Sequence, residues 1–126
     1  MNTYLMKALK ERVNNQYKVI SDDIGTYIRF LAKSTDFGDI VIYEETELKD
    51  SYMVEVGNLT HLHLNMCNES ASESVEFITN FLENLFADKL ICYNNGYFDI
   101  NDYNRLSEVD CDLFVWSGIY RRAEKD

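Results

Sequence analysis

The sequence predicts an α+β fold: an antiparallel sheet of about six or seven strands, a meander plus a hairpin, with two main helices packed on one face. Three observations support this. Residues 3–17 and 70–87 carry apolar side chains at helical spacing, and most other segments alternate with a period of two. Gly and Asn turn signals separate the alternating segments, which favours antiparallel neighbours. The element order α-β-β-β-β-α-β-β-(α)-β then gives two layers, with helices on one side and sheet on the other.

Size and composition predict one domain over residues 1–126. The chain is 46% hydrophobic and 13% aromatic, contains no proline, and shows no linker or internal repeat. Such a chain can bury a core without disulfide or metal support. Its three cysteines, Cys67, Cys92 and Cys111, are an odd set without CxxC spacing, which is typical of reduced thiols. Early charges and apolar runs of only about four residues argue against a signal peptide or a membrane span, so we expect a cytoplasmic location.

The first half of the chain is predicted to form one helix and the meander. The helix over 3–17 has an apolar face built on Leu5 and Leu9, and Asn14 is a plausible stop. The strands that follow are predicted at 26–33, 38–45, 51–56 and 59–67. Residues 57–58, Gly-Asn, have the composition of a two-residue hairpin loop between the last two strands.

The second half is predicted to open with a capped helix. Ser70 and Glu73 have the spacing of a capping box, in which each side chain satisfies a backbone amide near the other. This helix carries a polar stripe that we expect to be solvated: Glu73, Glu76, Asn80 and Glu83. A hairpin is predicted over 90–100 around Asn95-Gly96, Asn101 is expected to cap a short turn, and 112–122 is the last predicted strand.

The stretch HLHLNMCNES, residues 61–70, raises the question of a metal or catalytic site. In a strand, His61 and His63 point to the face opposite Leu62 and Leu64, so the histidines are predicted on a polar strand face. Cys67 would lie about 13 Å from His63 along the strand, too far to join it. The chain has no other histidine, no GxSxG elbow and no phosphate-binding glycine loop. We therefore expect no metal site, no cofactor and no enzymatic activity.

Charge is concentrated in the middle of the chain. The net charge is −10, and residues 34–113 hold three Lys or Arg against seventeen Asp or Glu. Such a surface attracts a basic partner and disfavours direct contact with nucleic acid, which requires clustered basic residues.

Two acidic clusters are the candidate partner-binding residues. The first surrounds a predicted turn and contains Glu44, Glu45, Glu47 and Asp50. The second interleaves carboxylates with aromatic side chains and contains Asp99, Asp102, Tyr103, Glu108, Asp110, Asp112 and Trp116. Aromatic anchors inside a charged rim are typical of interface hot spots. The alternative is that the first cluster is a solvated turn and that Tyr103 and Trp116 fill the core.

These patterns favour a non-catalytic protein-binding domain. The hypothesis is an acidic inhibitor or immunity-type protein, a monomer or weak dimer, that neutralises a basic partner such as a toxin nuclease. The high Asn and Ile content suggests an AT-rich bacterial or phage genome. One alternative is a small-molecule-binding or catalytic domain that uses His61 or His63 in a pocket between sheet and helices. Another is an accessory subunit of a larger assembly.

Overall fold

The chain has the predicted α+β architecture. The structure is a computed structural model that describes residues 3–23, 25–44, 52–64 and 71–120. The elements are, in order, α1 (Thr3–Arg12), β1 (Lys18–Ser21), β2 (Thr26–Phe30), β3 (Ile40–Glu44), β4 (Tyr52–Val56), β5 (Thr60–Leu64), α2 (Ala71–Phe86), β6 (Leu90–Tyr93), β7 (Gly96–Asp99), α3 (Tyr103–Glu108), β8 (Phe114–Val115) and β9 (Gly118–Ile119). No helix among these is long and apolar enough to cross a membrane.

The strands form two antiparallel sheets where the sequence predicted one. The first sheet is the meander β1-β2-β3-β4-β5, and the second has the order β7-β6-β8-β9. The edge strand β1 was not predicted as a separate strand because most of its side chains are exposed. The predicted strand 112–122 is instead the short hairpin β8–β9. Its turn contains Ser117, whose amide and hydroxyl both donate to the Asp88 carboxylate at the end of α2 (3.0 and 2.5 Å).

Both predicted hairpin loops exist, but the first is one residue longer than predicted and the second is displaced by one residue. Val56 pairs with Thr60, so the loop between β4 and β5 has the three residues 57–59. Gly57 has a φ of 58°, and a Cβ there would collide with the Phe37 carbonyl oxygen, so this position requires glycine. Tyr93 pairs with Gly96, so the second loop consists of 94–95.

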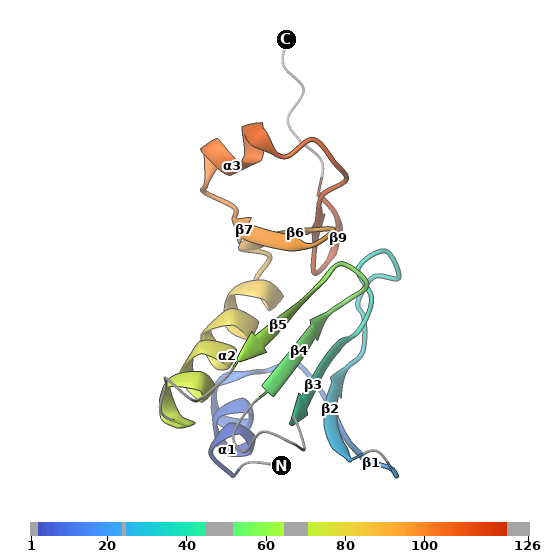
Figure 1. Ribbon diagram of the computed structural model, residues 1–126, viewed down its shortest axis with the longest axis vertical. Helices are drawn as coiled ribbons and strands as arrows, with labels where there is room; N and C mark the ends of the chain where they lie inside the picture. The colour runs from blue at the N-terminus through green and yellow to red at the C-terminus, as the bar shows by residue number, and fades with distance from the viewer. Residues whose placement is uncertain (1–2, 24, 45–51, 65–70, 121–126) are drawn as a thin grey trace.

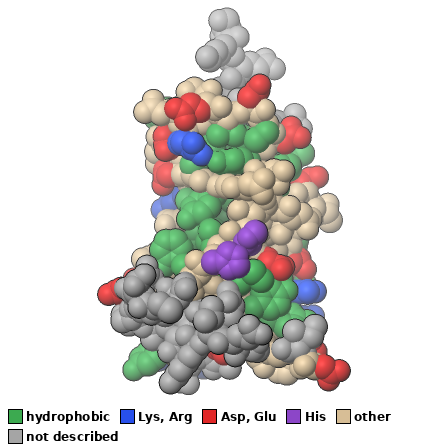
Figure 2. Space-filling view, viewed as in Figure 1, with side chains coloured by type: hydrophobic (Ala, Val, Ile, Leu, Met, Phe, Trp, Pro, Cys, Tyr) green, Lys and Arg blue, Asp and Glu red, His purple; other side chains and the backbone are tan. Residues whose placement is uncertain are grey.

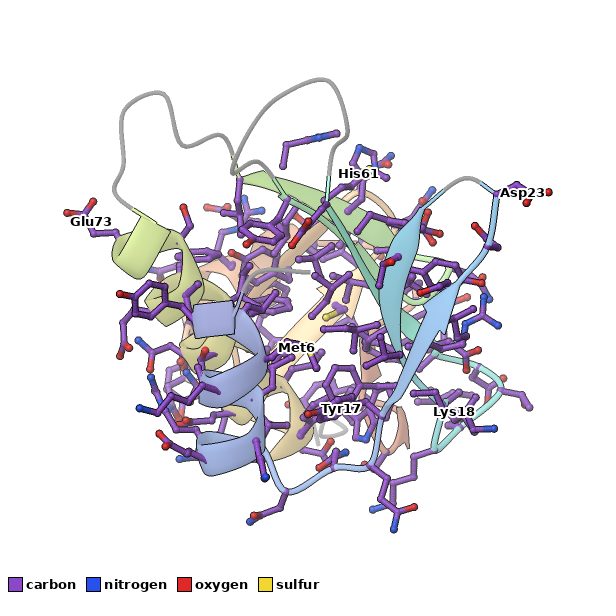
Figure 3. All side chains as sticks on the ribbon, turned by 90° about the horizontal axis from the view of Figure 1, so that it is seen from below. Met6, Tyr17, Lys18, Asp23, His61 and Glu73 are labelled. Carbon is purple, nitrogen blue, oxygen red and sulfur yellow. The ribbon has the colours of Figure 1, made fainter. Side chains whose placement is uncertain are left out.

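Helices α1 and α2 cover one face of the five-stranded sheet, as Figures 1 and 3 show. From α1, Leu5 and Leu9 are fully buried, and Met6 points toward the interior in Figure 3. The face of α2 that packs on this core is buried as well, with Leu82 and Leu85 at 0% exposure. On the sheet, one row of paired side chains points toward the helices. The strand register places four residues in this inward row: Ile28, Ile42, Val54 and Leu62.

The second sheet shares this core. Leu90, Cys92 and Trp116 belong to the same hydrophobic cluster as the residues between α1, α2 and the first sheet. Tyr97 packs edge-on against Phe81 of α2 at 5.0 Å between ring centroids, and burial followed by the nearby Cys92 raises the pKa of its hydroxyl. A smaller cluster on β6, β7 and β8 is covered by Leu106 and Val109.

The polar stripe of α2 is more than the solvated face that the sequence predicted. Arg12, the last residue of α1, donates from Nε to Glu83 (2.7 Å), from Nη1 to Glu76 (2.7 Å) and from Nη2 to the side chain of Asn80 (2.5 Å). Hydrogen bonds and charge from Glu83 and Glu76 raise the pKa of the guanidinium. Arg12 therefore fastens the end of α1 to three successive turns of α2.

We expect Arg12→Ala to destabilise the protein by about 1–2 kcal/mol. The estimate lies above a single exposed pair because one planar guanidinium makes three charge-assisted hydrogen bonds. Lys10→Ala, which removes an exposed charge from the same helix, should change stability by less than about 0.5 kcal/mol. Urea unfolding followed by circular dichroism compares the two variants, and equal effects would contradict the role assigned to Arg12.

Candidate partner-binding surface

The second acidic cluster forms a distinct surface, the acidic lobe, made of residues 99–112. Figure 1 places α3 at the end of the molecule away from α1, and Figure 2 shows several acidic side chains around that end. Four of its carboxylates are exposed and Asp102 is half-buried; the exposed ones are Asp99, Glu108, Asp110 and Asp112.

Local hydrogen bonds fix the conformation of the lobe. The Asp99 carboxylate accepts the amide of Asn101 at 2.8 Å. Asp102 is the N-cap of α3 and accepts the amide of Arg105 at 3.1 Å, so the predicted cap at Asn101 lies one residue further along the chain. These carboxylates are held in place before any partner arrives.

Tyr103 is the exposed aromatic side chain of the lobe. It is the first residue of α3 and is 72% exposed. Leu106 and Val109 of the same segment face the small cluster beneath α3. This arrangement leaves Tyr103 exposed on the same segment as the carboxylates of the lobe, and an exposed aromatic residue in a charged segment is typical of an interface anchor.

Arg105 is a positioning residue that the sequence reasoning missed. Its Nη2 donates to the Tyr93 hydroxyl at 2.6 Å, and its Nη1 lies 3.7 Å from the Glu108 carboxylate. The first contact ties α3 to β6, and the second partly neutralises Glu108. The spacing of Arg105 and Glu108, three residues apart on a helix, was a readable signal for the ion pair.

Trp116 is not part of the acidic lobe, and its prediction as a partner-binding residue is wrong. The side chain is 3% exposed and packs against Phe37 and Phe86, at 5.5 and 4.9 Å between ring centroids. A ring enclosed by the core cannot contact a partner. The alternative of core filling therefore holds for Trp116 and fails for Tyr103.

Glu44, the residue of the first acidic cluster that the structure describes, does not lie next to the acidic lobe. Glu44 ends β3 and pairs with Tyr52, whereas Ile40 at the other end of β3 pairs with Val56 beside the 57–59 loop. That loop contacts the second sheet through a bond of 2.8 Å from the Asn95 amide to the Leu59 carbonyl. Glu44 thus lies about 13 Å further away along the strand. Glu45, Glu47 and Asp50 lie outside the described residues.

The two histidines lie on the sheet face opposite the helices. Both are exposed, and their rings meet edge-on at 4.9 Å between centroids; Figure 2 shows them on the visible surface. Leu62 and Leu64 pack on the core, as the alternation predicted. His61 borders an open hollow of about 350 Å³ together with Glu55 and Asn95. The described ranges contain no group of three His, Cys, Asp or Glu side chains suited to a metal ion.

No family model, curated protein or solved structure matches the chain. Function therefore has to be inferred from the surface itself. Of the predicted site residues, Asp99, Asp102, Tyr103, Glu108, Asp110 and Asp112 lie together on the acidic lobe.

The two aromatic residues of the second cluster should respond oppositely to truncation. Trp116→Ala removes a buried ring and should cost about 3–5 kcal/mol of stability. Tyr103→Ala removes an exposed ring and should change stability by no more than about 0.5 kcal/mol. Urea unfolding of both variants measures this, and a large loss for Tyr103→Ala would contradict its placement in solvent.

Cysteine reactivity should separate Cys92 from Cys111. Cys92 is buried, and burial raises the pKa of its thiol from an ordinary value near 9.0 to about 12, whereas Cys111 is exposed. At pH 8 iodoacetamide should modify Cys111 rapidly and Cys92 only after unfolding. Peptide mass spectrometry identifies the modified cysteines, and equal labelling rates would contradict the buried position of Cys92. Cys67 lies outside the described residues.

The raised pKa of Cys92 also makes stability depend on pH. Because the thiol loses its proton at a higher pH in the folded than in the unfolded chain, stability should fall as the pH increases from about 9 toward 12.

Proposed function

We propose that the chain is a non-catalytic protein-binding domain whose acidic lobe binds a basic protein partner. The observation that carries this proposal is that Tyr103 is 72% exposed at the start of α3, in a segment that also carries the exposed carboxylates Asp99, Glu108, Asp110 and Asp112. Solvent-exposed aromatic side chains of this kind supply a large apolar contact and a hydrogen-bonding hydroxyl to an interface.

Electrostatics supports a basic partner. Among residues 99–112 the sequence holds five carboxylates and one basic residue, Arg105. Arg105 is engaged with Tyr93 and partly neutralises Glu108, so the other exposed carboxylates, Asp99, Asp110 and Asp112, keep their charge without a basic partner in the lobe. A field of one sign accelerates encounter with a surface of the opposite sign and fixes the orientation of docking.

Preorganisation supports tight binding through a small area. The Asp102 cap, the Arg105–Tyr93 bond and the packing of Leu106 hold α3 in one position. Association then costs less conformational entropy than it would for a disordered acidic segment. These are the properties that an inhibitor of a basic enzyme requires.

The partner class that fits is a nucleic-acid-binding enzyme such as a toxin nuclease. Its cleft must be basic to hold phosphate groups, and rigid carboxylates can occupy the positions of those phosphates. In this proposal the chain acts as an immunity-type inhibitor in the cytoplasm. An accessory-subunit role would use the same kind of surface and differs in the identity of the partner.

The alternative of a pocket between sheet and helices has little support. That space is filled by side chains no more than 1% exposed, such as Ile28, Phe30 and Leu82. The histidines face the other side of the sheet, beside an open hollow.

Binding kinetics tests the proposal. The chain serves as bait in lysate of the source cell, and captured proteins are purified for surface plasmon resonance. Asp110→Lys with Asp112→Lys should slow association at least tenfold, and Tyr103→Ala should raise the dissociation rate by the equivalent of about 2 kcal/mol. Raising salt from 0.1 to 1 M should slow association, because the screening length falls from about 10 to about 3 Å.

A matched control has the same change in net charge elsewhere. Asp23→Lys with Asp36→Lys reverses two exposed carboxylates outside the acidic lobe and should leave dissociation unchanged and association within about threefold. Inhibition of nuclease activity by the bait supports the immunity-type role. A partner that is not basic, or equal effects of both double variants, contradicts the proposal.

A further inference from the structure

The side of the five-stranded sheet that faces away from the helices has a composition of its own. This outer face consists of Lys18, Ile20, Tyr27, Arg29, Val41, Tyr43, Met53, Glu55, His61 and His63, which alternate with the inward residues along each strand. Figure 3 shows α1 and α2 on the opposite side of the sheet. Tyr, Met and Arg are residue types enriched in protein interfaces.

Strand register arranges these side chains in two rows. One row reads Lys18, Arg29, Val41, Glu55, His61 across the five strands. The neighbouring row reads Ile20, Tyr27, Tyr43, Met53, His63. In both rows the central residue belongs to β3, the middle strand of the sheet.

The first row is self-complementary about that middle strand. Arg29 and Glu55 lie one strand to either side of Val41, so they are about 10 Å apart on one chain. Consider a two-fold axis that runs parallel to β3, midway between two facing sheets. It brings the outer faces of two copies together and places β2 of the second copy over β4 of the first. It therefore places Arg29 of each copy over Glu55 of the other. An axis across the strands would instead stack like charges on each other.

The second row fits the same axis. Tyr27 then faces Met53 of the other copy, and the two Tyr43 rings meet at the centre. Tyr27 and Tyr43 already pack together at 5.5 Å between centroids. Glu55 lies on the neighbouring strand, diagonally across from Tyr43 and therefore close to the centre of the face. Burial, followed by the charge of Glu55, raises the pKa of Tyr43.

The contacts that Arg29 makes with the described part of its own chain are weak. Its Nε is buried without a hydrogen bond among the described residues, and the Asp39 carboxylate is 3.9 Å away. The guanidinium carbon lies 5.8 Å from the centre of the Tyr27 ring, and the side chain is 39% exposed. A carboxylate supplied by another molecule would pair with the exposed part of this side chain, not with the buried Nε.

We propose that the outer face binds a second copy of the chain, giving a two-fold dimer held by two reciprocal Arg29–Glu55 ion pairs around the Tyr43 contact. Five short strands cover roughly 20 by 17 Å, which belongs to the small class of interfaces that is typical of weak, transient association. Face-to-face sheets pack this way at a small angle between strand directions. This dimer uses a different surface from the acidic lobe and does not depend on the proposed function.

Charge exchange tests the dimer in sedimentation velocity over a range of micromolar concentrations. Arg29→Glu and Glu55→Arg should each raise the dimer dissociation constant at least tenfold, because each opposes two like charges across the axis. An equimolar mixture of the two variants should dimerise again, since both cross-pairs are then of opposite charge. The double variant Arg29→Glu/Glu55→Arg should also dimerise.

Two charge reversals on α1 serve as controls. Lys10→Glu and Glu11→Arg make the same charge changes at exposed positions of α1 and should leave the dissociation constant within about threefold. The mixture also guards against misfolding, because an unfolded variant would not be rescued by its counterpart. A wild-type chain that stays monomeric at all concentrations overturns the proposal, as does a dimer that neither single variant weakens.

Discussion

Trp116 packs edge-on against Phe37 and Phe86, and this contact joins parts of the chain that no local pattern connects. Phe86 also packs against Phe30 at 5.1 Å between ring centroids, and Phe30 packs against Tyr17 at 5.4 Å. Four aromatic rings therefore run from Tyr17, just before the first sheet, to Trp116 in the turn of the β8–β9 hairpin, and Phe37 is a fifth ring joined to Trp116. The hydrogen bonds from Ser117 to the Asp88 carboxylate also fix the position of that turn. The second sheet, and with it the acidic lobe, depends on this connection.

The fold separates two surfaces with different chemistry. One face of the first sheet must be covered by α1 and α2, because its inward row is entirely apolar. This leaves the outer face of the sheet uncovered, with the opposite charges of Arg29 and Glu55 on either side of Val41. The acidic lobe is carried at the end of the molecule by the second sheet, where Tyr103 stands among carboxylates. The proposed site for a basic partner and the proposed site for a second copy of the chain therefore share no residues.

The sequence predicted the features that depend on near neighbours. Strand alternation placed β2 to β5 and the orientation of His61 and His63, and the 3.6-residue period placed α2. It did not predict interactions between distant residues. The clamp from Arg12 spans 64 to 71 positions, and the enclosure of Trp116 depends on Phe37 and Phe86. Periodicity predicts the face of a helix or strand on which a side chain lies. It does not predict which other element packs against that face. For this reason Tyr103 and Trp116, similar in sequence context, have opposite environments.

Native-state hydrogen exchange tests most directly whether the Trp116 connection unites both sheets into the single domain predicted over residues 1–126. If it does, amides in the centres of β3 and β6 exchange through the same global opening. Their free energies of opening then agree within about 1 kcal/mol and fall together as urea is added. If β6 amides instead exchange through an opening several kcal/mol less costly than that of β3, the second sheet unfolds by itself. That result would contradict the rigid presentation of the acidic lobe on which binding of a basic partner depends.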